Sequence, residues 1–308
     1  MQIHRQYLGL PPEARGASVA MGNFDGVHLG HRSVIDLARG RGPLGVVTFE
    51  PHPREWFAPD APPFRLMNAE SRANRLARLG VRHLYELPFD AGLAGLTPRD
   101  FAARVLAEGL GVRHVVVGAD FRFGKGRAGT TRDLAALGEA LGFGVTVAPL
   151  IRHDGAEVSS TAIRRALTEG RPREAARMLG HWHRIEGPVV HGDKRGRTLG
   201  YPTANMDLGR LHPPRHGVYA VQVDVLTGRH RGRHGGAASL GVRPTFGVNR
   251  PNLETFLFDF AGDLYDEHLS VAFVEFLRPE MRFDGLPALV AQMDADCARA
   301  RDILAAVP

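Results

Sequence analysis

Two histidines stand three residues apart in the segment GNFDGVHLGH (residues 22–31), between an apolar strand-like run and a helical pattern. In the first turn of a helix, this spacing lets the imidazoles of His28 and His31 face one ligand. Gly22, Gly26 and Gly30 allow the backbone to approach that ligand closely, and the free N–H groups of a helix start attract anions. Zinc needs further ligands, and neither a cysteine nor an HExxH motif supplies them nearby. The segment predicts a phosphate-binding turn; the alternative is two histidines packed in a core.

A second dense motif, GDKRGRTLGYPTANM (residues 192–206), combines glycines with basic side chains. Pro202 fixes the backbone before Thr203 and Asn205, whose spacing of two places them on one side of an extended chain. Their oxygens, together with ATP phosphates, would suit Mg²⁺, which prefers oxygen ligands and keeps several waters. The alternative is a basic surface turn before a strand. The glycine and basic residues of the motif are Gly192, Lys194, Arg195, Gly196, Arg197 and Gly200.

The segment FRFGKGRAG (residues 121–129) looks at first like a Walker-A phosphate loop. It fails that test, because five residues, not four, separate Gly118 from Gly124, and Gly126 stands where Ser or Thr is needed. Two interpretations stay open: a mobile basic loop that covers a phosphate with Lys125 and Arg127, or a solvated surface turn.

The first 150 residues alternate strand-like apolar runs with helical patterns, which predicts a parallel sheet covered by helices on both faces. Asn68 and Thr97 are expected to cap helices over 69–79 and 98–110. Ligands sit at the carboxyl ends of such strands, which places the chemistry in the loops after Phe24, Phe49 and Gly118. The other expected elements are strands over 18–24, 44–49, 82–87, 114–118 and 145–151, and helices over 31–39 and from Thr130 or Thr131 to Leu141.

Short strand-like runs separated by Gly and Pro turns dominate residues 185–277, which predicts a small antiparallel barrel or sandwich. The tail returns to helical spacing and is expected to pack on the barrel as a closing helix. The predicted fold class is therefore α/β plus β, with one domain over 1–180 and another over 181–308. The expected strands cover 187–191, 218–225, 253–260 and 270–276, and the apolar stripe of the tail is Leu286, Leu289, Val290, Met293, Cys297, Ala300 and Leu304.

The composition narrows the class of protein. Of the 308 residues, 44% are hydrophobic and none of the apolar runs is long enough to span a membrane. A single cysteine, Cys297, excludes an internal disulfide and a thiolate zinc cluster, and the N-terminus lacks the apolar core of a signal peptide, so a cytoplasmic protein is expected. The net charge of +6 suits an anionic partner. Arginines are scattered, however, and no basic run is interleaved with aromatics, so no nucleic-acid partner is expected.

The histidine segment resembles the HxGH signature of nucleotidyltransferases that activate ATP at its α-phosphate. Its fuller form, GxFDGxHxGH, is similar to the adenylyltransferase half of bacterial bifunctional riboflavin kinase/FAD synthetases. TFEPHP (48–53), FRFGKGRAG and SSTAIRRAL (159–167) match the same family. Val158, where relatives usually have Ile, and Ala119, where a larger side chain is usual, depart from the pattern. The resemblance implies a Rossmann-like sheet for the first half.

The resemblance also implies roles for residues of the first half. Catalysis falls to His28 and His31. FMN would lie near Pro51, Pro53, Asp120 and Phe123. The implied ATP-binding residues are Gly22, Phe24, Asp25, His28, His31, Ser159, Ser160, Thr161 and Arg164.

The second half resembles the riboflavin kinase module of the same family, with its motifs in the same order: RTLGYPTAN, GVYAV (217–221), GVRPTFG (241–247), ETFLFDF (254–260) and FLRPE (276–280). The resemblance implies that Thr203 and Asn205 bind Mg·ATP, that Gly192, Lys194, Gly196 and Arg197 contact ATP, and that Glu254 is the catalytic base. Asp266 stands where relatives usually have Gly.

The two implied reactions make different demands. Adenylyl transfer uses the FMN phosphate as nucleophile, which is close to a dianion at neutral pH and needs no strong base. Phosphorylation of riboflavin uses a neutral alcohol, so a carboxylate such as Glu254 is needed to accept its proton. We therefore expect an enzyme that makes FMN and then FAD with ATP as substrate. There are two competing hypotheses. In one, only one of the two modules is active; in the other, the protein binds flavin or nucleic acid without being an enzyme. The sequence gives no oligomeric state.

Overall fold

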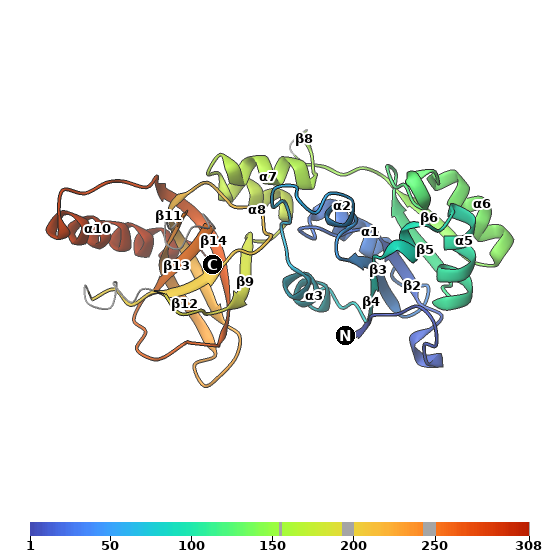
Figure 1. Cartoon of the computed structure of the whole chain (residues 1–308), viewed down its shortest axis with the longest axis horizontal. Helices are drawn as coiled ribbons and strands as arrows, with labels where there is room; N and C mark the ends of the chain where they lie inside the picture. The colour runs from blue at the N-terminus through green and yellow to red at the C-terminus, as the bar shows by residue number, and fades with distance from the viewer. Residues whose placement is uncertain (154–155, 193–199, 243–250, 308) are drawn as a thin grey trace. The chain divides into compact units, whose positions relative to one another are not determined.

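The computed structural model describes residues 1–153, 156–192, 200–242 and 251–307 (Figure 1). The chain forms two compact units. The first comprises Met1–Pro62 and Arg72–Ser159, and the second comprises Pro63–Ser71 and Ser160–Pro308. The contacts thus divide the chain before residue 180, and the short segment 63–71 groups with the second unit. The predicted boundary at residue 180 concerns the division of function and stays a prediction.

A six-stranded parallel sheet forms the centre of the first unit, in the order β1-β4-β3-β2-β5-β6 (Figure 1). The predicted parallel sheet is confirmed, although β1 at its edge was not expected. The strands are β1 (Gln2–His4), β2 (Ser18–Met21), β3 (Leu44–Glu50), β4 (His83–Pro88), β5 (His114–Gly118) and β6 (Gly144–Ala148); a short hairpin of β7 (Arg152–His153) and β8 (Ala156–Glu157) follows.

Alternate side chains of the central strands face opposite layers of helices. On one face, Val19, Met21 and Val117 belong to the same continuous apolar core as Phe101 and Val105. On the other face, α1 packs against β2 and β5. The helical elements are η1 (Pro12–Ala14), α1 (Leu29–Leu37), α2 (Pro53–Phe57), α3 (Ala69–Arg78), α4 (Ala91–Ala94), α5 (Pro98–Asp100), the π-helical η2 (Phe101–Gly109), η3 (Lys125–Arg127) and α6 (Thr131–Leu141).

The helix starts follow the predicted capping chemistry. The Thr97 hydroxyl accepts a hydrogen bond from the Asp100 N–H at 3.1 Å, with Pro98 at the first helical position. Thr130 forms a complete capping box with Asp133. Asn68 accepts from the Ser71 N–H at 2.8 Å. Each cap satisfies N–H groups that have no partner within the helix, so these positions fix where the helices begin.

An antiparallel sheet in the order β10-β13-β12-β11-β14-β9 forms the second unit. A bridge between Val190, after β9, and Asn205 of β10 nearly closes it into a barrel. The predicted barrel is confirmed; β12 was not expected. The elements are α7 (Ser160–Thr168), α8 (Pro172–Leu179), β9 (Arg184–Pro188), β10 (Ala204–Asp207), β11 (Gly217–Val225), β12 (Gly232–Val242), β13 (Pro251–Leu257), β14 (His268–Arg278) and α10 (Leu286–Ala305).

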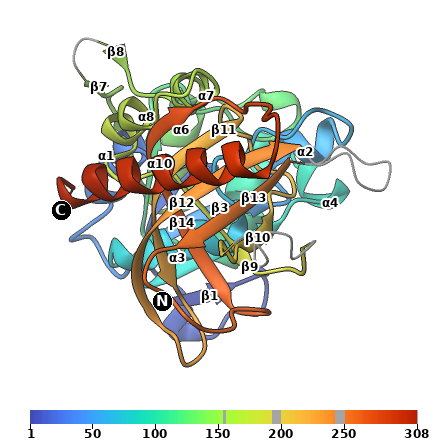
Figure 2. The same ribbon diagram turned by 90° about the vertical axis from the view of Figure 1, so that its left-hand side faces the viewer.

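The C-terminal helix α10 lies across the barrel, against β11, β12 and β14 (Figure 2). Ala300 is fully buried there, with Cys297 and Leu304 around it. The Arg278 guanidinium holds the Asp296 carboxylate at 2.7 Å, and Gln292 donates to the same carboxylate at 3.0 Å. The expected closing helix is present. Its predicted apolar stripe is wrong at Leu286, which is 61% exposed because the first turn of the helix extends past the apolar cluster.

Candidate active sites

The turn between β2 and α1 adopts an unusual backbone. Phe24 and Val27 have φ angles of 51° and 41°, in a region that side chains with a Cβ rarely occupy, and Gly26 has φ 89°. Each such non-glycine residue costs roughly 1–3 kcal/mol unless its surroundings hold it. Here the Thr48 hydroxyl of β3 donates to the Asn23 carbonyl at 3.2 Å, and the Val27 N–H donates to the Phe24 carbonyl at 3.1 Å. The strained turn delivers the two histidines to the start of α1.

His28 and His31 are close together, as their spacing predicts. The His28 Nδ1 accepts a hydrogen bond from the His31 backbone N–H at 3.3 Å and thereby caps α1. This nitrogen therefore carries no proton, and the Nε2–H of His28 is its donor. The two rings stack with centroids 3.6 Å apart. Burial, and then the neighbouring His28 ring, lower the pKa of His31 well below its usual value. Two neutral imidazoles can stack without repulsion and still offer N–H groups to a phosphate.

The surroundings of the pair are close-packed. A methyl carbon added at Gly30 would lie 3.1 Å from the His28 ring and 3.6 Å from the Val158 carbonyl. Val158 directly precedes Ser159, so the start of the second predicted phosphate segment lies beside the histidine turn. Phe24 is buried, with its ring edge-on to His31 at 5.2 Å, and Asp25 is buried as well. Both residues are part of the turn, and their predicted contact with ATP stays a prediction.

The residues predicted to contact flavin differ in accessibility. Pro51 and Asp120 are exposed, and Pro53 is half-buried at the first position of α2, where His52 accepts a hydrogen bond from the Arg54 N–H at 3.0 Å. Phe123 is 6% exposed and packs in the core, with its ring 5.9 Å from that of Phe101. Its predicted flavin contact stays a prediction, because the ring offers little surface in this structure.

An exposed aromatic cluster lies next to these residues and was not singled out from the sequence. Phe89 follows β4, and its ring makes edge contacts with the rings of Phe49, Trp56 and Phe57, with centroids 5.8–6.4 Å apart. Trp56 and Phe57 are 41% and 69% exposed. The signal in the sequence was the EWF triplet, which follows TFEPHP after Arg54. The partly buried rings at the carboxyl ends of β3 and β4, with the exposed rings of α2 beside them, offer a surface for a planar ligand.

A buried arginine holds the start of the TFEPHP turn. The Arg72 guanidinium is 1% exposed and donates to Glu50 at 2.9 Å and to Glu86 at 3.0 Å. A fully buried cation is stable only when it is paired in this way. Glu50 therefore acts as a structural anchor for the turn and not as an isolated base. Arg72 was not predicted, since nothing local in its helix marks it as buried.

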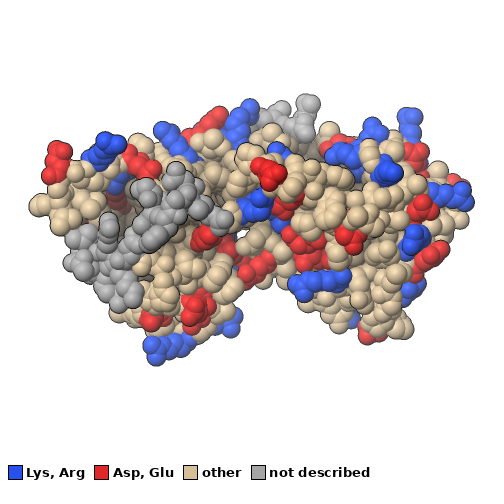
Figure 3. Space-filling model, in the orientation of Figure 1, with Lys and Arg blue, Asp and Glu red and all other residues tan. Residues whose placement is uncertain are grey.

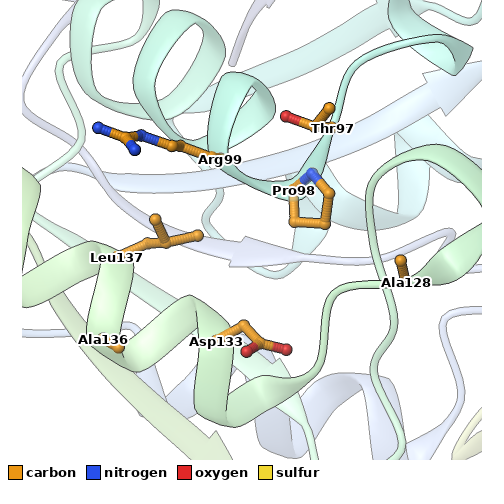
Figure 4. A pocket seen from close by; sticks show the side chains of 7 residues that line it. All are labelled: Thr97, Pro98, Arg99, Ala128, Asp133, Ala136 and Leu137. Atoms are coloured by element: carbon orange, nitrogen blue, oxygen red, sulfur yellow. The ribbon is translucent and has the colours of Figure 1, made fainter.

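The FRFGKGRAG loop forms a short turn and not a Walker-A loop. The Lys125 N–H donates to the Leu96 carbonyl at 2.7 Å, and Phe123 and Gly129 exchange backbone hydrogen bonds of 2.9 and 3.1 Å that close the loop. The hollow beside it is lined by residues of α5 and α6 and by Ala128 (Figure 4). None of the predicted site residues lines this hollow, so it is not the site that the motifs indicate.

In the second unit, α7 carries the rest of the SSTAIRRAL segment. Ser160 begins the helix, Thr161 is exposed and Arg164 is half-buried. The Arg164 Nε donates to the Phe64 carbonyl at 2.6 Å, and its guanidinium lies 5.3 Å from the centroid of the Phe64 ring. In this structure Arg164 thus binds the 63–71 segment.

The barrel brings Asn205 and Glu254 together. Asn205 of β10 pairs with Glu254 of β13 in the antiparallel register. Opposite residues of such a pair have Cβ atoms about 5 Å apart on the same face. Ala204 and Leu253 point into the core, so both polar side chains lie on the outer face of the barrel. A methyl carbon added at Gly192 would lie 2.5 Å from the Asn205 amide nitrogen, so any larger residue there would have to displace the Asn205 side chain.

Tyr201, just before β10, connects this part of the barrel to the closing helix α10. Its hydroxyl donates to the Asp294 carboxylate of α10, which raises the pKa of Tyr201 to about 12. Its ring packs edge-on against Phe256 at 5.0 Å. Thr203, half-buried, follows two residues later. The predicted ATP contacts of Lys194, Gly196 and Arg197 lie outside the described residues, as does most of GVRPTFG.

The donors in this part of the barrel fit a magnesium ion. Asn205 carries an amide oxygen and Thr203 a hydroxyl, and Glu254 is directly opposite Asn205 in the strand register. Mg²⁺ takes oxygen ligands of these kinds and completes its shell with water and phosphate. Among the described residues, no group of three or more His, Cys, Asp and Glu side chains could hold a metal. The predicted Mg²⁺ site at Thr203 and Asn205 stays a prediction.

Comparison with known proteins supports both halves. Residues 10–162 match the family model described as FAD synthetase, and residues 179–304 match the one described as riboflavin kinase. A bifunctional riboflavin kinase/FMN adenylyltransferase from Pseudomonas fluorescens is 44% identical, over 99% of this chain and 98% of its own. The chain belongs to the bifunctional riboflavin kinase/FMN adenylyltransferase family.

A second relative and a solved structure agree with this assignment. The Escherichia coli K12 protein is 40% identical over 93% of this chain and 92% of its own length. A solved structure described as a macrolide-efflux protein from Streptococcus pneumoniae matches with a TM-score of 0.81 at 33% identity, over 96% of this chain and 95% of that chain. The predicted family and fold class are confirmed. In the ranges that the structure describes, no helix is both long and apolar enough to span a membrane.

Proposed function

We propose that this chain phosphorylates riboflavin to FMN and adenylylates FMN to FAD, each time with ATP. The proposal is supported by two phosphate-binding constellations on two different folds, in a chain that matches the bifunctional family over nearly its full length. On this proposal, residues 1–180 carry the adenylyltransferase and residues 181–308 the kinase.

In the kinase reaction, Glu254 takes the proton of the riboflavin 5′-hydroxyl. The resulting oxygen attacks the γ-phosphorus of ATP, and ADP leaves with the electrons of the broken P–O bond. Thr203 and Asn205 would hold Mg²⁺, which neutralises phosphate charge when it is bound. Gly192 makes room for the Asn205 amide. A base placed on a strand of the barrel contributes about 10²–10⁴-fold to the rate.

In the adenylyltransferase reaction, an oxygen of the FMN phosphate attacks the α-phosphorus of ATP and pyrophosphate leaves. No proton has to be removed from the nucleophile. His28 and His31 donate N–H groups to the phosphate oxygens, on which negative charge builds up. The N–H groups at the start of α1 add to this. The isoalloxazine ring packs on the aromatic cluster of Phe49, Trp56, Phe57 and Phe89, with Pro51 and Pro53 beside it.

The proposed function also implies where the protein acts and what it binds. A chain with one cysteine needs no oxidising compartment, so we place it in the cytoplasm. Its partners are riboflavin, FMN, FAD and ATP, without nucleic acid. On the face shown in Figure 3, basic and acidic side chains are interspersed and do not form one continuous basic surface.

One experiment tests the proposal. The purified protein is incubated with riboflavin and Mg·ATP, and FMN and FAD are separated by chromatography over time. FMN should appear first and FAD should follow. Failure to form FMN would refute the kinase assignment, and FMN that accumulates without FAD would refute the adenylyltransferase assignment.

A further inference from the structure

Asn252 lies on β13, two residues before Glu254, on the same outer face of the barrel. Its Nδ2 donates a hydrogen bond to the Oδ1 of Asn205 at 3.1 Å, across 47 residues of sequence. In the strand register Asn252 is opposite Asp207, so this contact runs diagonally to the next residue of the same face. No motif singled Asn252 out, and no role discussed above includes it.

The two ends of the Asn205 amide are fixed by a chain of donors and acceptors. The Thr203 carbonyl can only accept, and it receives the Asn205 Nδ2 at 3.3 Å. The oxygen end of the amide must therefore face away from Thr203, and this is the end that Asn252 meets. Asn205 is 6% exposed, with Gly192 directly against its amide. The donor on Asn252 holds the orientation from the other side.

This orientation matters because the same oxygen is the predicted ligand of Mg²⁺. A flipped amide would present two N–H groups to a cation. An amide oxygen has two lone pairs, so a hydrogen bond from Asn252 and a bond to a metal ion are compatible.

We propose that Asn252 is a positioning residue of the kinase site. Its amide N–H fixes the oxygen end of Asn205 for Mg·ATP, while Glu254 on the same strand face takes the proton. The inference rests on the proposed kinase function and adds a residue that touches neither substrate nor metal.

The experiment compares Asn252→Leu, which keeps the branching of the side chain but removes the donor, with the parent protein. Gln222→Leu is the matched control, because Gln222 is a half-buried amide residue on β11 of the same barrel. Binding of Mg·ADP and of ADP with EDTA is measured by calorimetry. The KM for Mg·ATP and the kcat of FMN formation are measured alongside.

We expect Asn252→Leu to weaken Mg·ADP binding and to raise the KM for Mg·ATP by about 3- to 10-fold, the range for one lost hydrogen bond. Binding of ADP with EDTA, FAD formation from FMN, and all properties of Gln222→Leu should stay unchanged. Asn252→Ala provides a second variant if the leucine prevents folding.

Unchanged Mg·ADP binding in a folded variant would overturn the proposal. So would an equal loss with and without the metal, since that would indicate general packing. Failure of the underlying function looks different: the parent protein would then form no FMN, or Asn205→Ala would form it at the parent rate.

Discussion

The histidine turn and the Asn205–Glu254 face differ in how the chain assembles them. His28 and His31 lie three residues apart, and one strand, one strained turn and one helix start bring them together. Asn205 and Glu254 lie on different strands and meet only because β10 and β13 pair in one register. The first site is local in sequence, whereas the second exists only after the barrel has closed. A change far from the second site can therefore damage it.

The two sites also differ in the charge they bring. The histidine turn offers neutral N–H donors and helix N–H groups, which suits a nucleophile that is already an anion. The barrel face offers a carboxylate beside oxygen ligands, which suits an alcohol that must lose a proton. In the proposed assignment, the same cosubstrate is used by two sets of residues with little in common. Variants can separate the two activities within one chain.

The largest difference between the two activities is expected for Glu254→Gln. The amide cannot accept the proton of the riboflavin hydroxyl, so FMN formation should fall by about 10²–10⁴-fold. FAD formation from added FMN should stay at the parent rate, measured in the same preparation by chromatography. A variant that converts riboflavin as fast as the parent would show that Glu254 is not the base.

The opposite separation is expected from His28→Asn. Asparagine is a strong helix cap, so α1 should keep its start, but the imidazole Nε2–H is lost. FAD formation should fall by about 10²–10³-fold, the usual effect of removing one preorganised donor, while FMN formation continues. His28→Ala is the companion variant and should in addition lose about 1 kcal/mol of stability in urea denaturation. Parallel loss of both activities would contradict the idea of two separate sites.

Gly192→Ala tests the close packing of the barrel site. The added methyl would lie 2.5 Å from the Asn205 amide, and overpacking of this kind costs typically 1–3 kcal/mol. We expect a rise of roughly 5- to 100-fold in the KM for Mg·ATP of the kinase. Gly187→Ala is the matched control, because the nearest atom to its methyl is 3.9 Å away. If both variants behave alike, Asn205 has more room than the structure indicates.

The smallest effect concerns acid stability of the second unit. Burial lowers the pKa of His183 from 6.5 to about 3, with a further contribution from His212 and His181. The native ring stays neutral while the unfolded chain takes up a proton, so stability present above pH 6.5 is lost as the pH falls toward 3. The loss is about 1.4 kcal/mol per pH unit. Urea denaturation at pH 7.5 and 5.5 should show it, and His183→Phe should reduce it; an equal loss in that variant would contradict the assignment.

Local features were the ones that could be predicted from the sequence. The capping by Thr97 and Asn68 and the proximity of His28 to His31 depend on neighbours within a few residues, and the parallel sheet follows from the repeated alternation of strand and helix patterns. Glu254 could be assigned a role only through family resemblance, because its pairing with Asn205 depends on strand register. β12, which contains glycines and few large apolar residues, gave no clear alternation.

The contacts that sequence reasoning missed are those made across long separations. In the sequence, Arg72 cannot be distinguished from an exposed helix residue, because its partners Glu50 and Glu86 lie far away along the chain. No nearby residue indicates the contact of Asn252 either. Phe123 packs in the core in this structure, which its position next to glycines does not indicate, and its flavin contact stays a prediction. Pairing geometry, and not composition, decides these cases.

The segment Pro63–Ser71 lies within the first half of the sequence but belongs to the second structural unit. Its Asn68 donates to the Glu186 carbonyl of β9 at 2.8 Å, its Arg65 bridges Leu211, and its Glu70 pairs with His268 at 3.0 Å. The second unit thus includes nine residues from within the first half of the sequence. A kinase fragment that begins at residue 181 would lack this segment and would expose the three contact sites on Glu186, Leu211 and His268. If the gene were split between the two activities, the kinase would therefore need substitutions on the surface that residues 63–71 now cover.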